Sequence, residues 1–251
     1  MGTDTLRHPC LRTFEDTGDA RVRLFCLPHA GGSASAYREW QRALGTSVEV
    51  VAVQYPGRGS RIGEPSLTRM PDLVADLLEG VGPWTKRPWA LFGHSMGAAV
   101  AHELAHAVAR AGYPDPLRLF VSAREAPQLS RPGTVHQRDD DGLVAELSRL
   151  AGTATELLAD PQARRLFLPP VRADYQLIET YRPTMEPLRC PVTALAADSD
   201  PEATREEVAA WRAVSPEGFE LSEWSGHHFY LDDHLPEVAR LITDRLDADL
   251  G

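Results

Sequence analysis

The sequence predicts an α/β fold in which a mostly parallel sheet is flanked by helices. Short apolar runs, of the kind that form buried strands, alternate along the chain with longer helix-like segments. This alternation is the pattern of successive βαβ units. The chain has 251 residues, of which 43% are hydrophobic, and this suffices for one α/β domain with its own core. We therefore expect residues 1–251 to form a single domain.

The individual strands and helices are predicted from apolar patterns bounded by turn residues. The first apolar run ends at Pro28, and the second ends before the turn at 56–59, because proline and glycine interrupt regular structure. Pro71 suits the first turn of a helix, and Gly112 follows the end of another. The expected strands are 22–27, 48–54, 89–92, 117–122, 192–196 and 219–223, and the expected helices are 71–78, 98–110 and 235–246.

The segment 125–183, which we call the lid block, interrupts this alternation. It contains no evident strand, and its apolar residues recur at helical spacing, with prolines expected to separate its helices. One helical face holds Leu143, Val144, Leu147 and Leu150, a second holds Val171, Tyr175, Ile178 and Tyr181, and the prolines are Pro161, Pro169 and Pro170. A helical insertion between two strands is expected to cover the strand ends, where ligands bind in such sheets. The alternative is a helical layer without a functional role.

Charge and composition argue against several classes of partner. Lys and Arg total 26 against 36 Asp and Glu, a formal net charge of −10, whereas a general nucleic-acid binder needs a basic face. No stretch approaches the ~20 apolar residues of a membrane span, and the first 20 residues hold no apolar segment typical of a secretory signal. The three cysteines lack metal-ligand spacing, so we expect reduced thiols and a cytoplasmic protein.

The strongest local signal is the sequence GHSMG at 93–97, a G-x-S-x-G pattern centred on Ser95. A predicted strand precedes it and a predicted helix follows it, which is the setting of a nucleophile elbow. The glycines permit a turn that is too tight for side chains, and the helix start favours negative charge beside the serine. Ser95 is therefore the candidate nucleophile, the alternative being a glycine-bounded turn without chemistry.

A serine hydroxyl needs a base to accept its proton, and α/β-hydrolases carry Ser, acid and His in that chain order. The acid should follow the strand at 192–196, where Asp198 and Asp200 both occur. The base should follow the last strand, where His227, His228 and His234 are available. Spacing alone leaves these choices open.

An oxyanion hole should combine the residue after the nucleophile with the loop after the first strand. That loop reads PHAGGS at 28–33, and its small residues allow a backbone N–H to approach a substrate carbonyl. We assign the N–H groups of Ala30 and Met96 to this role. The loop lacks the spacing of a phosphate-binding glycine loop.

A second motif, the H-E-x-x-H at 102–106, is the helical signature of zinc proteases, and Glu125 could be a third ligand. We instead expect His102 and His106 to form a polar stripe opposite the face that packs on the sheet. That apolar face comprises Ala98, Ala101, Leu104, Ala105 and Val108. No metal and no cofactor is expected, and a zinc hydrolase is retained only as a rival enzyme class.

Further segments show that the chain resembles type II thioesterases of polyketide and nonribosomal peptide synthesis, an α/β-hydrolase family. The similarity runs from about residue 24 to residue 246. The segments that carry it are PHAGG at 28–32, PGRG at 56–59, GHSMG at 93–97, VSAREAP at 121–127, LAGT at 150–153, DY at 174–175, ETY at 179–181 and DSDP at 198–201.

The resemblance implies an α/β-hydrolase fold with a helical lid, a triad of Ser95, Asp200 and His228, and no cofactor. The chain departs from the family pattern at two positions: His227 replaces a glycine that is usual there, and Ala197 stands where a glycine is common before the loop that carries the acid. The resemblance also implies a substrate: an acyl group on the phosphopantetheine arm of an acyl or peptidyl carrier protein, removed to edit stalled or misprimed synthases.

The lid block would then bound an acyl chamber, with candidate lining residues Leu147, Phe167 and Tyr175, and lid arginines such as Arg164 and Arg165 could contact an acidic carrier protein. Two alternatives use the same fold. One is a general esterase or lipase, and the other is a non-catalytic binding module, which the complete Ser, Asp and His set opposes.

Overall fold

The computed structural model describes residues 8–18, 20–151 and 156–251. Its centre is a seven-stranded sheet with the order β1-β3-β2-β4-β5-β6-β7. The strands are β1 (Leu11–Arg12), β2 (Val22–Leu27), β3 (Val48–Val53), β4 (Trp89–His94), β5 (Leu119–Ser122), β6 (Val192–Ala197) and β7 (Phe219–Trp224). All neighbouring pairs are parallel except β1 with β3. The predicted α/β class with a mostly parallel sheet is therefore confirmed.

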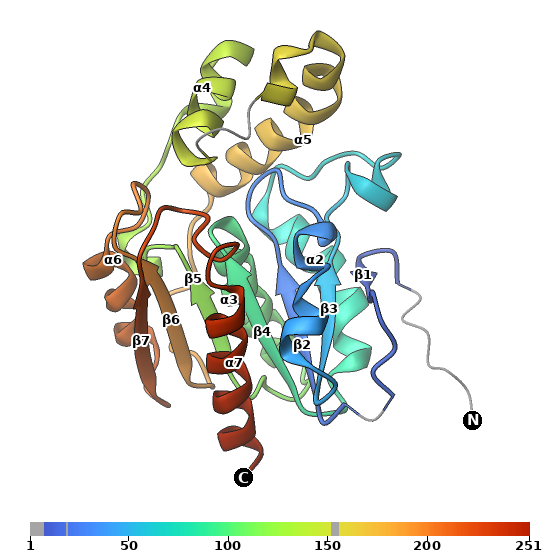
Figure 1. Cartoon of the computed structure of the whole chain (residues 1–251), viewed down its shortest axis with the longest axis vertical. Helices are drawn as coiled ribbons and strands as arrows, with labels where there is room; N and C mark the ends of the chain where they lie inside the picture. Colours follow the sequence, from blue (N-terminus) through green and yellow to red (C-terminus); the bar gives the residue numbers. More distant parts are fainter. Residues whose placement is uncertain (1–7, 19, 152–155) are drawn as a thin grey trace.

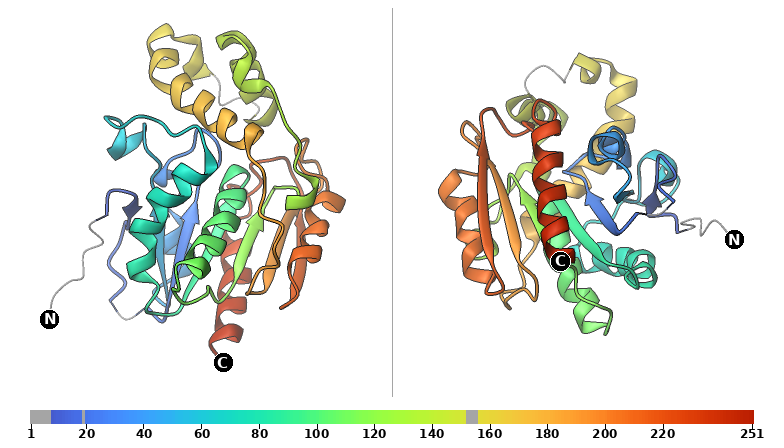
Figure 2. Two further views of the ribbon diagram at one scale, coloured as in Figure 1. Left: turned by 180° about the vertical axis from the view of Figure 1, so that it is seen from behind. Right: turned by 60° about the horizontal axis from the view of Figure 1, so that its bottom comes forward.

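Helices cover both faces of the sheet (Figures 1 and 2). The α-helices are α1 (Trp40–Leu44), α2 (Met70–Val81), α3 (Met96–Arg110), α4 (Asp140–Ala151), α5 (Pro161–Thr180), α6 (Arg205–Ala209) and α7 (Leu235–Leu250). Short 3-10 turns are η1 (Ala34–Tyr37), η2 (Gly59–Arg61), η3 (Gly82–Trp84), η4 (Pro127–Leu129), η5 (Val135–Gln137), η6 (Glu156–Ala159) and η7 (Ala210–Val214). No helix of the described ranges is both long and apolar enough to span a bilayer.

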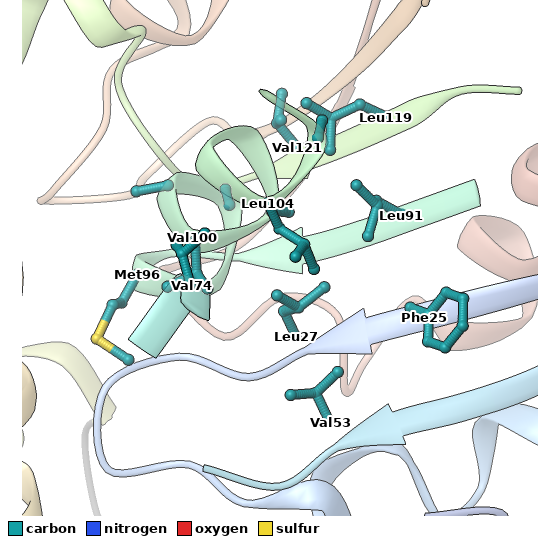
Figure 3. Packing of buried hydrophobic residues seen from close by; sticks show 14 of the residues in the cluster. Phe25, Leu27, Val53, Val74, Leu91, Met96, Val100, Leu104, Leu119 and Val121 are labelled. Atoms are coloured by element: carbon teal, nitrogen blue, oxygen red, sulfur yellow. The ribbon is translucent and has the colours of Figure 1, made fainter. Parts of the chain in front are cut away.

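Alternation along the strands divides the core into two layers, because successive side chains of a strand point to opposite faces. Phe25 and Leu27 of β2 pack with α2 and α3 on one face (Figure 3). Leu24 and Cys26 of the same strand pack with α1 and α7 on the other. These two apolar clusters hold the sheet between the helices, and the sheet in turn positions the loops at its carboxyl edge.

Helices α4 and α5, between β5 and β6, stand together beyond one end of the sheet (Figures 1 and 2). A small separate core of Leu143, Leu158, Leu168, Val171 and Tyr175 joins them. The expectation that prolines would divide the second half of this block is wrong, since α5 runs unbroken through Pro169 and Pro170. These prolines cannot bond the carbonyls four residues earlier, but those carbonyls belong to the exposed residues 165 and 166, where water can donate to them.

Candidate active site

Ser95 lies on a strained turn between β4 and α3. Its backbone has φ 55° and ψ −120°, a combination that side-chain-bearing residues rarely adopt. A Cβ atom on Gly93 would lie 2.3 Å from the Gly97 carbonyl oxygen, and one on Gly97 would lie 2.1 Å from that of Leu27. The two glycines are thus required by close backbone approach, and the turn has the geometry expected of a nucleophile elbow.

His228 and Asp200 form a buried pair at the ends of β7 and β6. The Nδ1 atom of His228 lies 3.0 Å from both carboxylate oxygens of Asp200, and both side chains are almost fully shielded from water. The backbone N–H of Glu202 also donates to Asp200, at 2.8 Å. The carboxylate therefore holds the imidazole ring in one orientation and leaves its Nε2 atom for another partner.

The other candidates for the acid and the base, Asp198, His227 and His234, form different contacts. Asp198 is exposed and accepts hydrogen bonds from the Gly226 N–H and the Ser199 hydroxyl, which lower the pKa of its carboxyl group. His227 is also exposed, with its Nδ1 3.1 Å from the Ser199 carbonyl oxygen. The ring of His234 contacts the Ser225 carbonyl oxygen at 2.9 Å. Asp198 and His227 thus connect the loops after β6 and β7 to each other, and His234 contacts its own loop, whereas Asp200 and His228 contact one another.

A cavity of about 410 Å³ unites the predicted residues. Ser95 and His228 line it together with Ala30 and Met96, and Figure 3 shows Met96 at the carboxyl end of the strands. Asp200 lies behind His228 and does not line the cavity. The lid block supplies much of the opposite wall, including Leu147, Leu150, Leu158, Val171, Tyr175 and Ile178.

Of the three lid residues expected to line the chamber, Leu147 and Tyr175 do so and Phe167 does not. Phe167 is 44% exposed. The amino-terminal half of α5 projects beyond the sheet (Figure 1). Phe167 belongs to this half, so its side chain contacts solvent although it lies one helical turn before Val171, which lines the cavity. Arg165 is exposed, while Arg164 pairs with Asp141 at 2.6 Å.

Besides the Asp200 carboxylate, aromatic rings surround His228. The His94 ring lies 5.2 Å from it and Phe229 lies 5.2 Å from it, both measured between ring centroids. Burial lowers the pKa of His94 well below its usual range, and burial with the nearby His228 lowers the pKa of His29 to about 4. Both neighbouring rings thus remain neutral near pH 7 and place no competing positive charge beside His228.

The loop after β2 folds into a tight turn over residues 29–32. The Gly32 N–H donates to the His29 carbonyl at 2.9 Å, and Gly31 has φ 77°, as the third position of a type II turn requires. The Gly31 N–H donates to a carboxylate oxygen of Asp174 at 2.7 Å. Sequence reasoning missed this contact, although Asp174 lies in one of the family-like segments.

The H-E-x-x-H residues are polar but buried, so the expected stripe does not face solvent. The Nε2 atoms of His102 and His106 are 3.3 Å apart. The Glu103 carboxylate accepts hydrogen bonds from the Tyr181 hydroxyl and from the N–H and hydroxyl of Thr184. Within the described ranges, no three His, Cys, Asp or Glu side chains are grouped to hold a metal ion. The motif connects α3 to the end of α5.

Comparisons with known proteins match nearly the whole chain to one family. A thioesterase domain model matches residues 22–246. Thioesterase PikA5 of Streptomyces venezuelae is 44% identical over 244 residues, covering 96% of this chain and 86% of the relative. The type II thioesterase BorB from the borrelidin biosynthetic cluster has 40% identity and a TM-score of 0.87, covering 95% of this chain and 98% of that one.

A second structure, the RedJ thioesterase from the prodiginine pathway of Streptomyces coelicolor, has 37% identity and a TM-score of 0.83. It covers 92% of this chain and 87% of its own. Domain match, sequence identity and fold agree with one another, and the chain belongs to the thioesterase family.

Proposed function

We propose that the protein hydrolyses acyl thioesters carried on the phosphopantetheine arm of acyl or peptidyl carrier proteins, and so clears stalled or misprimed groups from a synthase. The observation that carries this proposal is a single cavity lined by the strained Ser95 and by His228, whose ring is held by buried Asp200. Similar proteins named as type II thioesterases of biosynthetic clusters support the substrate class.

The proposed reaction begins when Ser95 attacks the thioester carbonyl and His228 accepts its proton. Asp200 maintains the tautomer with the proton on Nδ1, because that nitrogen faces the carboxylate, and stabilises the imidazolium ion that forms. The N–H groups of Ala30 and Met96 stabilise the oxyanion of the tetrahedral intermediate. In this proposal the His–Asp pair and the two N–H groups are already in place before the substrate binds.

The second half of the reaction releases the products. The tetrahedral intermediate collapses, the C–S bond breaks, and the leaving thiol takes the proton from His228, which becomes neutral again. Because a thiol has a pKa of ~8.5, it needs less protonation than an amine would. Water, deprotonated by His228, then attacks the ester on Ser95, and the acid departs as the serine recovers its proton. Every proton transfer uses a side chain of the described site, so the proposed cycle requires no metal and no cofactor.

The lid block is proposed to enclose the acyl chain during this cycle. Apolar residues of α4 and α5, among them Leu147, Tyr175 and Ile178, face the nucleophile across the cavity. This apolar part of the wall can bury an acyl chain by the hydrophobic effect, while charged side chains such as Glu146 and Glu202 line other parts of the cavity. We place the enzyme in the cytoplasm, because its three cysteines are buried and free, as in proteins of reducing compartments.

The test uses carrier proteins loaded with different acyl groups, incubated with the enzyme and weighed intact by mass spectrometry. Loss of the acyl mass with retention of the phosphopantetheine mass is the expected result. The Ser95→Ala variant is the control and should leave the acyl mass in place. Release by that variant at the wild-type rate would refute the serine mechanism.

The second candidate is an esterase or lipase with a simpler substrate, favoured only by the fold and the apolar cavity. Rates on acyl-carrier thioesters and on oxygen esters of the same acyl group separate the two functions. A higher kcat/KM on the oxygen ester would replace the proposed substrate class.

A further inference from the structure

The turn at residues 29–32 has two possible arrangements of its central peptide. Types I and II of a four-residue turn differ by a flip of the peptide that joins the second and third residues, here Ala30 and Gly31. The observed φ of 77° at Gly31 belongs to type II. The proposed oxyanion donor, the Ala30 N–H, belongs to the peptide before this one, so a flip would not reverse the donor but would shift it through the altered backbone of Ala30.

Asp174 of α5 contacts this peptide directly. One of its oxygens accepts the Gly31 N–H at 2.7 Å, and the carboxylate is buried. A flipped peptide would direct the Ala30 carbonyl oxygen at the carboxylate instead of an N–H, which is repulsive. A Cβ atom on Gly31 would lie 2.8 Å from Cγ2 of Val171, so the turn rests against the same helix.

Arg58 in turn holds Asp174. Its guanidinium donates to both carboxylate oxygens, with the Nη2 to Oδ1 distance at 2.7 Å, and both side chains are more than nine-tenths shielded. The guanidinium stacks over the Tyr55 ring, and the Tyr55 hydroxyl donates to the Pro28 carbonyl at 3.2 Å. The carboxylate is therefore held by the guanidinium and by the Gly31 N–H, in a geometry suited to bidentate pairing with the arginine, and Tyr55 supports the arginine.

We propose that Asp174 and Arg58 are positioning residues, which rests on the proposed function: they hold the turn in the form that presents the Ala30 N–H to the reacting carbonyl. Asp174 belongs to the lid block, while Ala30 belongs to the loop after β2. The pair thus connects the position of α5 to the stabilisation of the transition state. It does not touch the substrate.

Two double variants isolate the acceptor atom. Arg58→Met with Asp174→Asn removes both buried charges but keeps an oxygen for the Gly31 N–H. Arg58→Met with Asp174→Leu removes that oxygen as well. Replacing a buried ion pair by neutral residues is often tolerated, so both proteins should fold, and unfolding in urea confirms this. If leucine prevents folding, Asp174→Ala replaces it in the same comparison.

The assay measures kcat and KM on the hexanoyl thioester of N-acetylcysteamine and the inhibition constant of butylboronic acid, whose serine adduct places an oxygen in the oxyanion hole. Loss of one oxyanion donor costs about 10²–10³ in kcat, and a displaced donor should cost less. We expect the leucine variant to lose about 10–100-fold in kcat and in boronic acid affinity, with KM changed less than about threefold. The asparagine variant should lose about two- to fivefold, because it keeps an acceptor oxygen for the Gly31 N–H but lacks the Arg58 guanidinium that holds it in place.

A matched control uses another bidentate pair, Arg118 with Asp249, which lies between β5 and α7 at the opposite end of the sheet. Arg118→Met with Asp249→Leu should change stability but leave kcat unchanged. Equal kcat for the asparagine and leucine variants would overturn the inference, as would a loss confined to KM. If wild type hydrolyses no thioester, or Ser95→Ala remains active, the proposed function itself fails and this inference falls with it.

Discussion

The substitution Asp200→Asn tests the acid assignment most directly. In the native protein, the His228 Nδ1–H is shared between two carboxylate oxygens, each 3.0 Å away. An asparagine would turn its NH₂ group toward that nitrogen for part of the time and so favour the tautomer with the proton on Nε2. That tautomer cannot accept the proton of Ser95. A serine protease loses about 10⁴ in kcat from the equivalent change, which corresponds to about 5.4 kcal/mol of transition-state free energy.

The neighbouring Asp198→Asn is a matched control, because it makes the same chemical change two residues away. Asp198 is exposed, and its hydrogen bond from the Gly226 N–H can be kept by the asparagine oxygen. We expect kcat within about threefold of wild type for this variant. Thiol release from a diffusible thioester gives the rates, and a thermal melt shows that both variants are folded. Retention of more than a tenth of the activity in Asp200→Asn, or a larger loss in Asp198→Asn, would refute the assignment.

Four further predictions concern the base, the elbow, the buried histidine pair and metal. His228→Ala should reduce kcat by several orders of magnitude and His227→Ala only slightly; the reverse order of rates would move the base to residue 227. Ser95→Gly should be inactive yet about 1–2 kcal/mol more stable to urea than Ser95→Ala, because glycine relieves the strain at φ 55°; equal stabilities would contradict that strain. Burial, followed by the nearby His102, lowers the pKa of His106 to about 4, below its pKa in the unfolded chain. The free energy that neutral His106 contributes to folding is therefore fully present above pH 6.5 and is lost as the pH falls toward 4. His106→Gln should therefore lose about 2 kcal/mol less than wild type over that interval, after allowance for solvent screening, and parallel urea titrations would count against it. Dialysis against a chelator should leave the thioesterase rate unchanged, whereas a loss restored by zinc would revive the metalloenzyme reading.

Sequence reasoning predicted the central strands because their burial on both faces leaves a continuous apolar run. It missed β1, α1 and α6, which have two, five and five residues, too few for any periodicity to emerge. It also placed a break in α5 at Pro169 and Pro170, since local rules cannot show that the freed carbonyls face water. The outcome of such rules depends on what surrounds the helix.

At the active site too, local sequence patterns predicted some residues, and tertiary contacts decided the others. Ser95 could be identified from its motif and its setting between a strand and a helix, and the chain order narrowed the acid and the base to a few residues. The choice of Asp200 over Asp198 depends on which carboxylate is buried beside the imidazole. Arg58 and Asp174 are 116 positions apart, and no spacing rule connects them. Tertiary packing alone brings that pair to the turn.

The Glu103 carboxylate accepts three hydrogen bonds from Tyr181 and Thr184 and so fixes the carboxyl-terminal end of α5. It clamps the chain just past the end of α5 to the long helix that starts beside the nucleophile. The Asp174–Arg58 pair fixes the same helix further along, so the stretch of α5 between residues 174 and 180 is held to the body of the protein at both ends. The α5 residues that line the chamber, Val171, Tyr175 and Ile178, lie within or next to this stretch, so the width of the chamber beside Ser95 should vary little from one acyl chain to another.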